Sequence, residues 1–193
     1  MANRNTVGFG LISQGALGST PATQGQGKYY IEANHATSLY NGTAVKQSAG
    51  FIITAQANIT DTVIGVLNGV FYNAATTEKP TWQNYYSQVT PANSENITAF
   101  VIDNPFQLYV TSFDTAIPIA NMGATFGMST TTGSTQSGQS SNMMLLAGGD
   151  ATANTWRTVR IAEDPENSDI TAINCSVVVV QNLNQYNNGV TMA

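Results

Sequence analysis

The sequence predicts an all-β fold: a single antiparallel β-barrel or β-sandwich domain with an extended N-terminal arm and long polar loops. The residues that favour strands (Thr, Val, Ile, Tyr and Phe) are plentiful, whereas those that favour long helices are scarce. Short apolar runs also follow one another at roughly the 8–12-residue rhythm of sandwiches and barrels. The chain of 193 residues is long enough to bury a sizeable core.

Residues 1–27 are expected to form the arm, ahead of a domain that spans residues 28–193. The arm carries six glycines and shows no sustained apolar period, which is typical of irregular chain. Within it we expect one short strand, at residues 7–11, and little core.

The first half of the domain shows the alternation of half-buried strands. Tyr29 and Ile31 point to one face of a strand at residues 28–34, while Tyr30 and Glu32 point to the other. A tight turn of the hairpin type follows at residues 41–42. Strands at residues 43–47 and 51–57 should then form a hairpin. Residues 61–72 are apolar on both faces apart from one asparagine, so we expect the central strand there.

Six further strands are expected, at residues 82–89, 96–102, 106–111, 143–146, 155–162 and 173–180. The strands at 96–102 and 106–111 should pair as a meander across the turn at residues 103–105. Residues 129–142 form a low-complexity loop without a single apolar residue. We expect this loop outside the core and either mobile or ordered against a partner. We also expect a turn at residues 148–150 and, from residue 182, a tail that is frayed or docked on a neighbour.

Composition excludes several classes of function. Only 9% of the residues are charged and the net charge is −5, so six scattered basic residues cannot form the positive stripe that nucleic acid requires. The longest apolar run, residues 177–180, is far too short to span a membrane. The first residues also lack the apolar segment of a secretory signal. We therefore expect synthesis in a cytoplasm, with neither nucleic acid nor membrane as a partner.

The sequence contains few candidates for catalytic or metal-binding residues. His35 and Cys175 are the sole histidine and cysteine, which excludes internal disulfides and the usual zinc sites, and neither lies in a nucleophile signature. Aspartates at turns, such as Asp103, Asp164 and Asp169, are explained by capping of the backbone. A glycosidase needs only two suitably spaced carboxylates, so the presence of eleven acidic residues does not exclude this class of enzyme. We expect no enzyme, no catalytic residue, no cofactor and no metal.

Aromatic side chains are the best candidates for a contact surface. Tyrosines and tryptophans could line a sugar-binding platform, although in an all-β domain most of them should lie in the core or in cross-strand pairs. Trp82, Tyr85 and Tyr86 are the strongest set, since their segment is flanked by prolines and carries few other apolar groups. A subunit interface would use these three residues equally well.

Several short motifs occur in a distinctive order. The opening is MANRNTVGFGLI, and KYYIEANHATSLYNGTAVK places Ala-Thr-x-Leu-Tyr-x-Gly between two strands. Then come the central strand VIGVLNGVFY, the Asp-Asn-Pro turn of FVIDNPFQLYV, and the polar loop TTGSTQSGQSSNMML. In this order the motifs resemble the small β-rich capsid cement, or decoration, proteins of tailed bacteriophages. The resemblance spans most of the chain and is loosest from residue 152 onward.

The resemblance implies a structural virion protein that binds the outer surface of a phage capsid and stabilises it by bridging neighbouring major capsid proteins. It also implies a homo-oligomer, with a trimer favoured. The arm would extend along neighbouring capsomers and contact them through Val7, Phe9 and Leu11. The alternatives are a minor head or tail structural protein and a carbohydrate-binding β-sandwich module.

Overall fold

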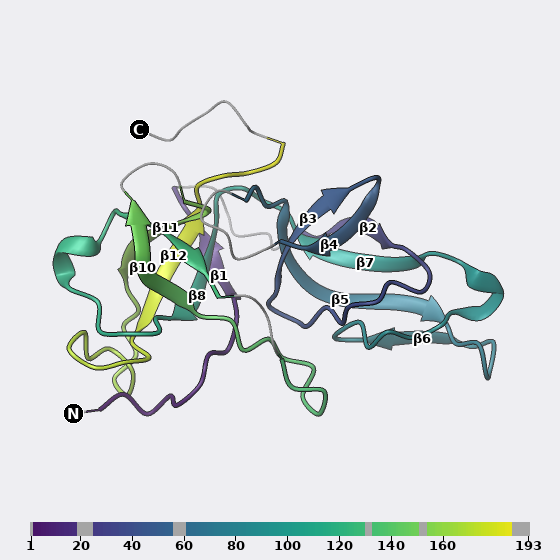
Figure 1. Ribbon diagram of the computed structural model, residues 1–193, viewed down its shortest axis with the longest axis horizontal. Coiled ribbons are helices and arrows are strands. Elements are labelled where there is room, and N and C mark those ends of the chain that lie inside the picture. Colours follow the sequence, from purple (N-terminus) through teal and green to yellow (C-terminus); the bar gives the residue numbers. More distant parts are fainter. Residues whose placement is uncertain (1, 19–24, 56–60, 130–132, 151–153, 187–193) are drawn as a thin grey trace.

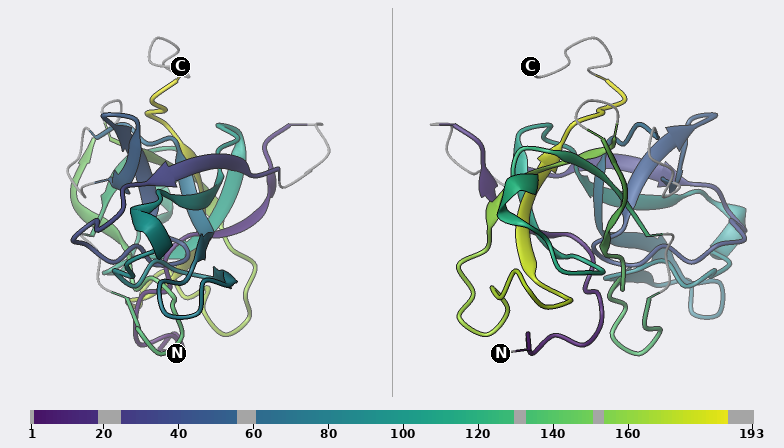
Figure 2. Two further views of the ribbon diagram at one scale, coloured as in Figure 1. Left: turned by 90° about the vertical axis from the view of Figure 1, so that its right-hand side faces the viewer. Right: turned by 60° about the vertical axis from the view of Figure 1, so that its left-hand side comes forward.

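The computed structural model describes residues 2–18, 25–55, 61–129, 133–150 and 154–186, with the side chains of 147–150 left out. Two antiparallel six-stranded sheets pack as a sandwich, and the described residues form no closed barrel (Figure 1). The all-β expectation is therefore confirmed, and of its two architectures the sandwich is the one that forms. Sheet A occupies one half of the molecule and sheet B the other (Figures 1 and 2).

Sheet A has the strand order β1-β8-β12-β11-β9-β10. Its strands, in that order, are Ile12–Ala16, Gln107–Ser112, Ser176–Gln181, Trp156–Ile161, Thr125–Met128 and Met144–Asp150. An isolated bridge between Phe113 and Met144 brings the end of β8 beside β10, so the sheet curls around its own side chains. The central strand β12 is apolar on both faces because both are covered.

Sheet B has the order β2-β7-β5-β3-β4, and β6 pairs with β5. These strands are Gly27–Ile31, Ile97–Ile102, Gly65–Asn73, Ala44–Ser48 and Phe51–Thr54, with β6 at Pro80–Gln83. Since β5 pairs with β7, β3 and β6, the expected central strand is confirmed. The hairpin of β3 and β4 is confirmed as well. Two 3-10 helices, η1 (Ala92–Ser94) and η2 (Ile119–Asn121), lie in connections.

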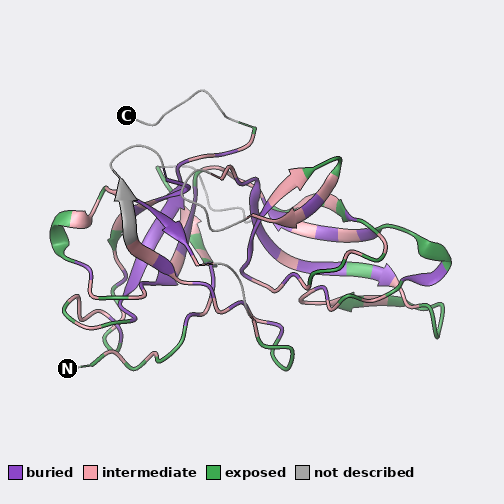
Figure 3. Cartoon of the chain, viewed as in Figure 1, coloured by how far each residue is buried: buried purple, intermediate pink, exposed green. Residues whose placement is uncertain are grey.

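The apolar core falls into three clusters. The largest joins the inner face of sheet A to Ala44 of β3, Val63 and other residues in or beside sheet B. It contains the edge-to-face pair Tyr109 and Trp156, whose ring centroids are 5.6 Å apart. A second cluster lies under sheet B alone, and a small third cluster lies on the other face of sheet A. Figure 3 shows long buried stretches in β5 and β12.

The structure corrects several local predictions about strands. The expected meander does not form, because β7 belongs to sheet B and β8 to sheet A, so the turn at residues 103–105 carries the chain between sheets. The turn expected at residues 148–150 lies inside β10, whose Asp150 pairs with Thr125. Strand β9 was not predicted, since its four residues are too few to show an alternation.

The N-terminal segment packs against sheet A. Its strand, β1, lies at Ile12–Ala16 and not at residues 7–11, and it pairs antiparallel with β8 as the edge strand of the sheet. The glycines before it serve close packing rather than freedom of the chain: a Cβ on Gly8 would lie 2.2 Å from the carbonyl oxygen of Ser141. Figure 2 shows the segment beside the loop that precedes β12.

Candidate interaction surfaces

The six residues predicted to contact a partner do not form one surface. Val7 and Trp82 are 67% and 59% exposed, and Phe9 and Tyr85 are half-buried. Leu11 and Tyr86, by contrast, are 2% and 0% exposed and belong to two different core clusters. A partner therefore cannot reach either of them in the folded chain.

Tyr85 and Tyr86 are engaged within the chain itself. The ring of Tyr85 stacks on that of Tyr40 with centroids 5.6 Å apart, and its hydroxyl donates a hydrogen bond to the carbonyl of Thr135. The hydroxyl of Tyr86 donates to the carbonyl of His35 over 2.8 Å. The sequence predicted that these two rings make contacts with a partner, but it could not show that their contacts lie within the chain.

The polar loop supplies the partner of Tyr85. Within residues 133–142 of this loop, the carbonyl of Gly138 accepts a hydrogen bond from the backbone N–H of Asn41, and the backbone N–H of Ser140 donates to the carbonyl of Asn41. The side chain of Gln139 donates to the carbonyl of Phe9 over 2.8 Å. This part of the loop is therefore ordered against its own chain and ties the N-terminal segment to the Tyr40 turn.

The N-terminal segment carries three apolar side chains that are exposed or half-buried. Val7, Phe9 and Ile12, which we call the N-terminal ridge, are 67% exposed, half-buried and 50% exposed, respectively. Phe9 and Ile12 line an open groove of about 500 Å³ that continues over Val110 of β8 to Ser176 of β12. Two of the three ridge residues were predicted; Ile12 was missed because the strand was expected to end before it.

Polar contacts hold the ridge in place. The guanidinium of Arg4 donates to both carboxylate oxygens of Glu166 at 2.7 Å, and the Asn3 side chain donates to the carbonyls of Asp169 and Ile173. The amide of Asn5 donates to the side chain of Asn167 over 2.7 Å. The start of the chain is thus clamped to the loop before β12.

A second exposed surface crosses sheet B. Tyr30 of β2 pairs with Thr98 of β7, Thr98 pairs with Phe71 of β5, and Phe71 pairs with Trp82 of β6. Directly opposed residues share one face of a sheet, so these four side chains form a row across four strands, here called the aromatic row. Its three aromatic members are 45%, 40% and 59% exposed, and Figure 3 shows the exposed parts of β5 and β6 next to each other.

Phe71 is the aromatic member of this row that the sequence did not single out. The sequence of β5 is apolar on both faces, so it predicts burial on both. The structure leaves one face of the strand exposed at Phe71. The neighbouring row is Lys28, Phe100 and Gly69, also joined by register. The Lys28 ammonium lies 5.6 Å from the centroid of the Tyr30 ring.

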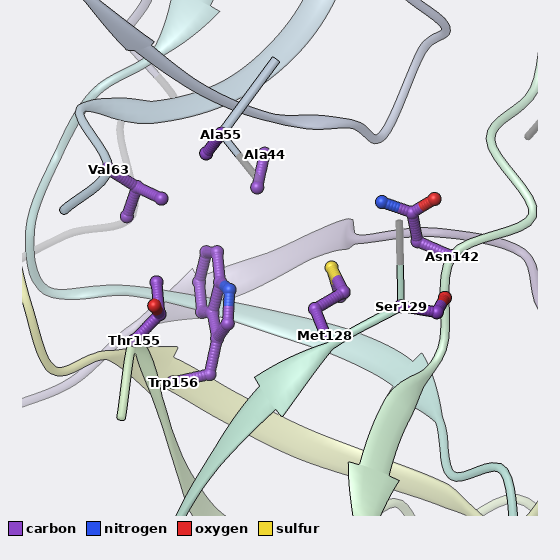
Figure 4. Close-up of a pocket in the computed structure, with 8 residues that line it drawn as sticks. All are labelled: Ala44, Ala55, Val63, Met128, Ser129, Asn142, Thr155 and Trp156. Atoms are coloured by element: carbon purple, nitrogen blue, oxygen red, sulfur yellow. The ribbon is translucent and has the colours of Figure 1, made fainter. Parts of the chain in front are cut away.

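The cavity between the sheets is too small for a ligand. Ala44, Ala55 and Val63 face Met128 and Trp156 across it, with polar groups at its margin (Figure 4). Its volume of about 10 Å³ is that of a single water molecule. We therefore assign it to imperfect packing where the sheets meet.

The titratable groups are held by structural contacts. Burial lowers the pKa of His35, opposed in part by Glu32, and burial raises the pKa of the Cys175 thiol. Hydrogen bonds from Thr171 lower the pKa of Asp169 to about 2, and the Asn167 side chain lowers that of Asp164 in the same way. Both aspartates cap their own turns, as expected from their positions.

Burial together with a hydrogen bond to Asp103 raises the pKa of Tyr29. Within the described ranges, no group of three or more acidic, histidine or cysteine side chains is arranged to hold a metal ion. In the same ranges, no helix has the length and apolarity needed to cross a membrane. Comparisons with protein-family models, with curated proteins and with solved structures found no match.

Proposed function

We propose that this chain is a structural virion protein that binds the outer surface of a tailed-phage capsid and bridges neighbouring major capsid proteins. The observation that carries the proposal is the N-terminal ridge, an exposed apolar strip clamped in one conformation. Because Arg4 and Asn3 already fix the segment, contact by the ridge costs little ordering entropy. This differs from an arm that orders only when it binds.

The edge of sheet A supports the same proposal. Strand β1 pairs with β8 on one side, and no other described strand pairs with its outer side. An extended segment of a capsid protein could therefore add to this edge by main-chain hydrogen bonds, while Ile12 contributes an apolar contact. The ridge and the edge meet at Ile12, which belongs to both.

The composition of the exterior fits a contact that tolerates salt. With 9% charged residues, the chain must meet a partner largely through amides, hydroxyls and apolar groups, whose interactions are not screened by ions. As part of the proposal, the protein forms a homotrimer on the shell. Three linked surfaces raise the effective affinity without any single strong contact.

The test uses capsids purified without this protein, to which the wild-type chain, two ridge variants and one control variant are added. Val7→Asp and Ile12→Asp place a carboxylate on the ridge at positions that are largely exposed, so the fold should be retained. Each should weaken capsid binding at least tenfold. Ile119→Asp, at a residue that is 61% exposed in η2, is the matched control and should bind as the wild type does.

Copy number in purified virions separates the proposal from its closest alternative. A capsid-binding protein should approach the copy number of the major capsid protein, whereas a minor head or tail protein should be present in a few copies. Complete absence from virions, or binding that neither ridge variant changes, would overturn the proposal.

A further inference from the structure

We propose that the aromatic row of sheet B binds a neutral polysaccharide, with Tyr30, Phe71 and Trp82 stacking on its sugar rings. The faces of a sugar ring carry C–H groups, and its edge carries hydroxyls. Exposed aromatic rings suit the faces, and polar groups beside them suit the edge. This site is separate from the N-terminal ridge and does not depend on capsid binding.

Strand register fixes the spacing of the rings. From Tyr30 to Trp82 the row crosses three strand separations, or about 14 Å. The Cα positions are set by backbone pairing in four strands, so the row needs no rearrangement to receive a ligand. A rigid row of rings matches an extended polymer of repeating units better than a compact small molecule.

The indole of Trp82 is oriented by a glycine. A Cβ on Gly69 would lie 2.8 Å from Cζ2 and 3.2 Å from Cε2 of the Trp82 ring. The ring therefore rests against the backbone of β5, while 59% of the residue stays exposed. Any larger residue at position 69 would displace the ring from the row.

Polar groups line the row, and they carry no excess of positive charge. By alternation, Glu32, Asn96 and Asn73 follow Tyr30, Thr98 and Phe71 on the same face, and all three are exposed or half-buried. On the opposite side of the row, Lys28 is the one cation. The Asn73 side chain also donates to the carboxylate of Glu95, so Lys28 faces two carboxylates and the site has no excess of positive charge. It therefore favours uncharged sugars over acidic ones.

The size of the face argues against a folded protein as its occupant. The face spans about 14 Å across the strands and about 14 Å along them from Lys28 to Glu32, or about 200 Å² in plane. A stable protein–protein interface needs about 800 Å² from each partner. A single polysaccharide chain lying along the row needs no more than the face offers.

The two tryptophans make binding directly measurable. Trp156 is 1% exposed in the core and Trp82 is 59% exposed in the row, so a ligand-induced change in emission reports on Trp82. The probes are four neutral polysaccharides: hydroxyethyl cellulose, laminarin, mannan and dextran. The full chain should be retarded in native gels that contain at least one of them, and the same polysaccharide should shift its tryptophan emission.

Substitutions then assign the binding to the row. Trp82→Ala and Tyr30→Ala should each weaken the interaction at least tenfold, and the conservative Trp82→Tyr should retain most of it. Phe106→Ala removes a ring that is 46% exposed outside the row, so it should bind as the wild type does. Thermal unfolding of each variant shows whether it is folded, and Tyr30→Ala preserves the test if Trp82→Ala does not fold.

Three results would overturn the proposal. The first is no retardation of the wild type by any of the four polysaccharides. The second is retardation that persists in both Trp82→Ala and Tyr30→Ala. The third is concentration-dependent self-association, seen by sedimentation and abolished by Trp82→Ala, which would assign the row to an interface between copies of the chain.

Discussion

The hydroxyl of Tyr85 donates a 3.0 Å hydrogen bond to the carbonyl of Thr135, fifty residues further along the chain. The neighbouring Asn84 donates to the carbonyl of Ser137 over 2.8 Å, and a Cβ on Gly138 would lie 2.5 Å from the Tyr85 ring. A segment with no apolar side chain of its own is thus ordered by an aromatic ring from a distant part of the sequence.

This relationship predicts that Tyr85 controls exposure of the polar loop to protease. Tyr85→Ala removes both the hydrogen bond and the ring, so limited proteolysis within residues 133–140 should accelerate severalfold. Tyr85→Phe keeps the stacking on Tyr40 and loses one exposed hydrogen bond, worth about 1 kcal/mol or less, so its cleavage rate should stay near that of the wild type. Equal cleavage rates for the wild type and Tyr85→Ala would contradict the assignment.

Close packing at Gly8 gives a second prediction. A Cβ at this position would meet the carbonyl oxygens of Ser141 and Asn142 at 2.2 and 2.7 Å, and backbone cannot move aside as a flexible side chain can. Gly8→Ala should therefore lower the free energy of unfolding by about 1–3 kcal/mol, measured by urea denaturation.

Gly15 provides the control for that measurement. It lies in β1, has no atom within 4 Å of an added Cβ, and does not require a positive φ. Gly15→Ala should leave the free energy of unfolding unchanged or slightly raised. Equal effects at the two positions would show that the N-terminal segment is not packed as described.

His35 predicts a pH dependence of stability. Its Nε2 is buried and accepts or donates no hydrogen bond within the described structure, and burial lowers its pKa from the ordinary value of 6.5. The unfolded chain therefore binds the proton more readily, so stability is fully present above about pH 6.5 and falls as the pH drops towards the lowered pKa.

The melting temperature should accordingly fall between pH 7 and pH 5 in the wild type, and it should fall less in His35→Gln. The lowered pKa of Asp169 acts in a separate window, because its contribution is lost only as the pH falls below about 4 towards 2. Asp169→Asn should therefore keep the decline between pH 7 and pH 5. If His35→Gln declines as steeply as the wild type, another group is responsible.

The sequence shows individual strands better than it shows how they pair. The central strand and the β3–β4 hairpin could be predicted because apolar runs and turn residues are local signals. The change of sheet after β7 could not, because the turn at residues 103–105 looks the same whether the next strand pairs with the last or crosses to the other layer. What decides between them is the fit of side chains from distant segments, such as Tyr109 against Trp156.

The candidate surfaces were likewise predicted only in part, because exposure also depends on contacts between distant segments. Exposed Val7 and Trp82 were predicted as contacts, but so were buried Leu11 and Tyr86, since a large apolar side chain looks alike in sequence whether it faces solvent or core. The glycines before β1 were equally ambiguous, because glycine is compatible with a flexible arm and with a tightly packed segment. Glycines permit flexibility, yet those in this segment also permit backbones to approach closely.

The final prediction separates packing from binding within the N-terminal segment. Leu11 is 2% exposed and joins the largest core cluster, so Leu11→Ala should lower the free energy of unfolding by about 2–5 kcal/mol. Val7, only four residues away, is 67% exposed, so Val7→Ala should leave unfolding within about 0.5 kcal/mol of the wild type. Under conditions where both variants are folded, capsid binding should show the reverse order, with the larger loss at Val7. If Leu11→Ala were to weaken binding more than Val7→Ala while leaving stability intact, Leu11 would face the partner and the segment would leave sheet A on binding.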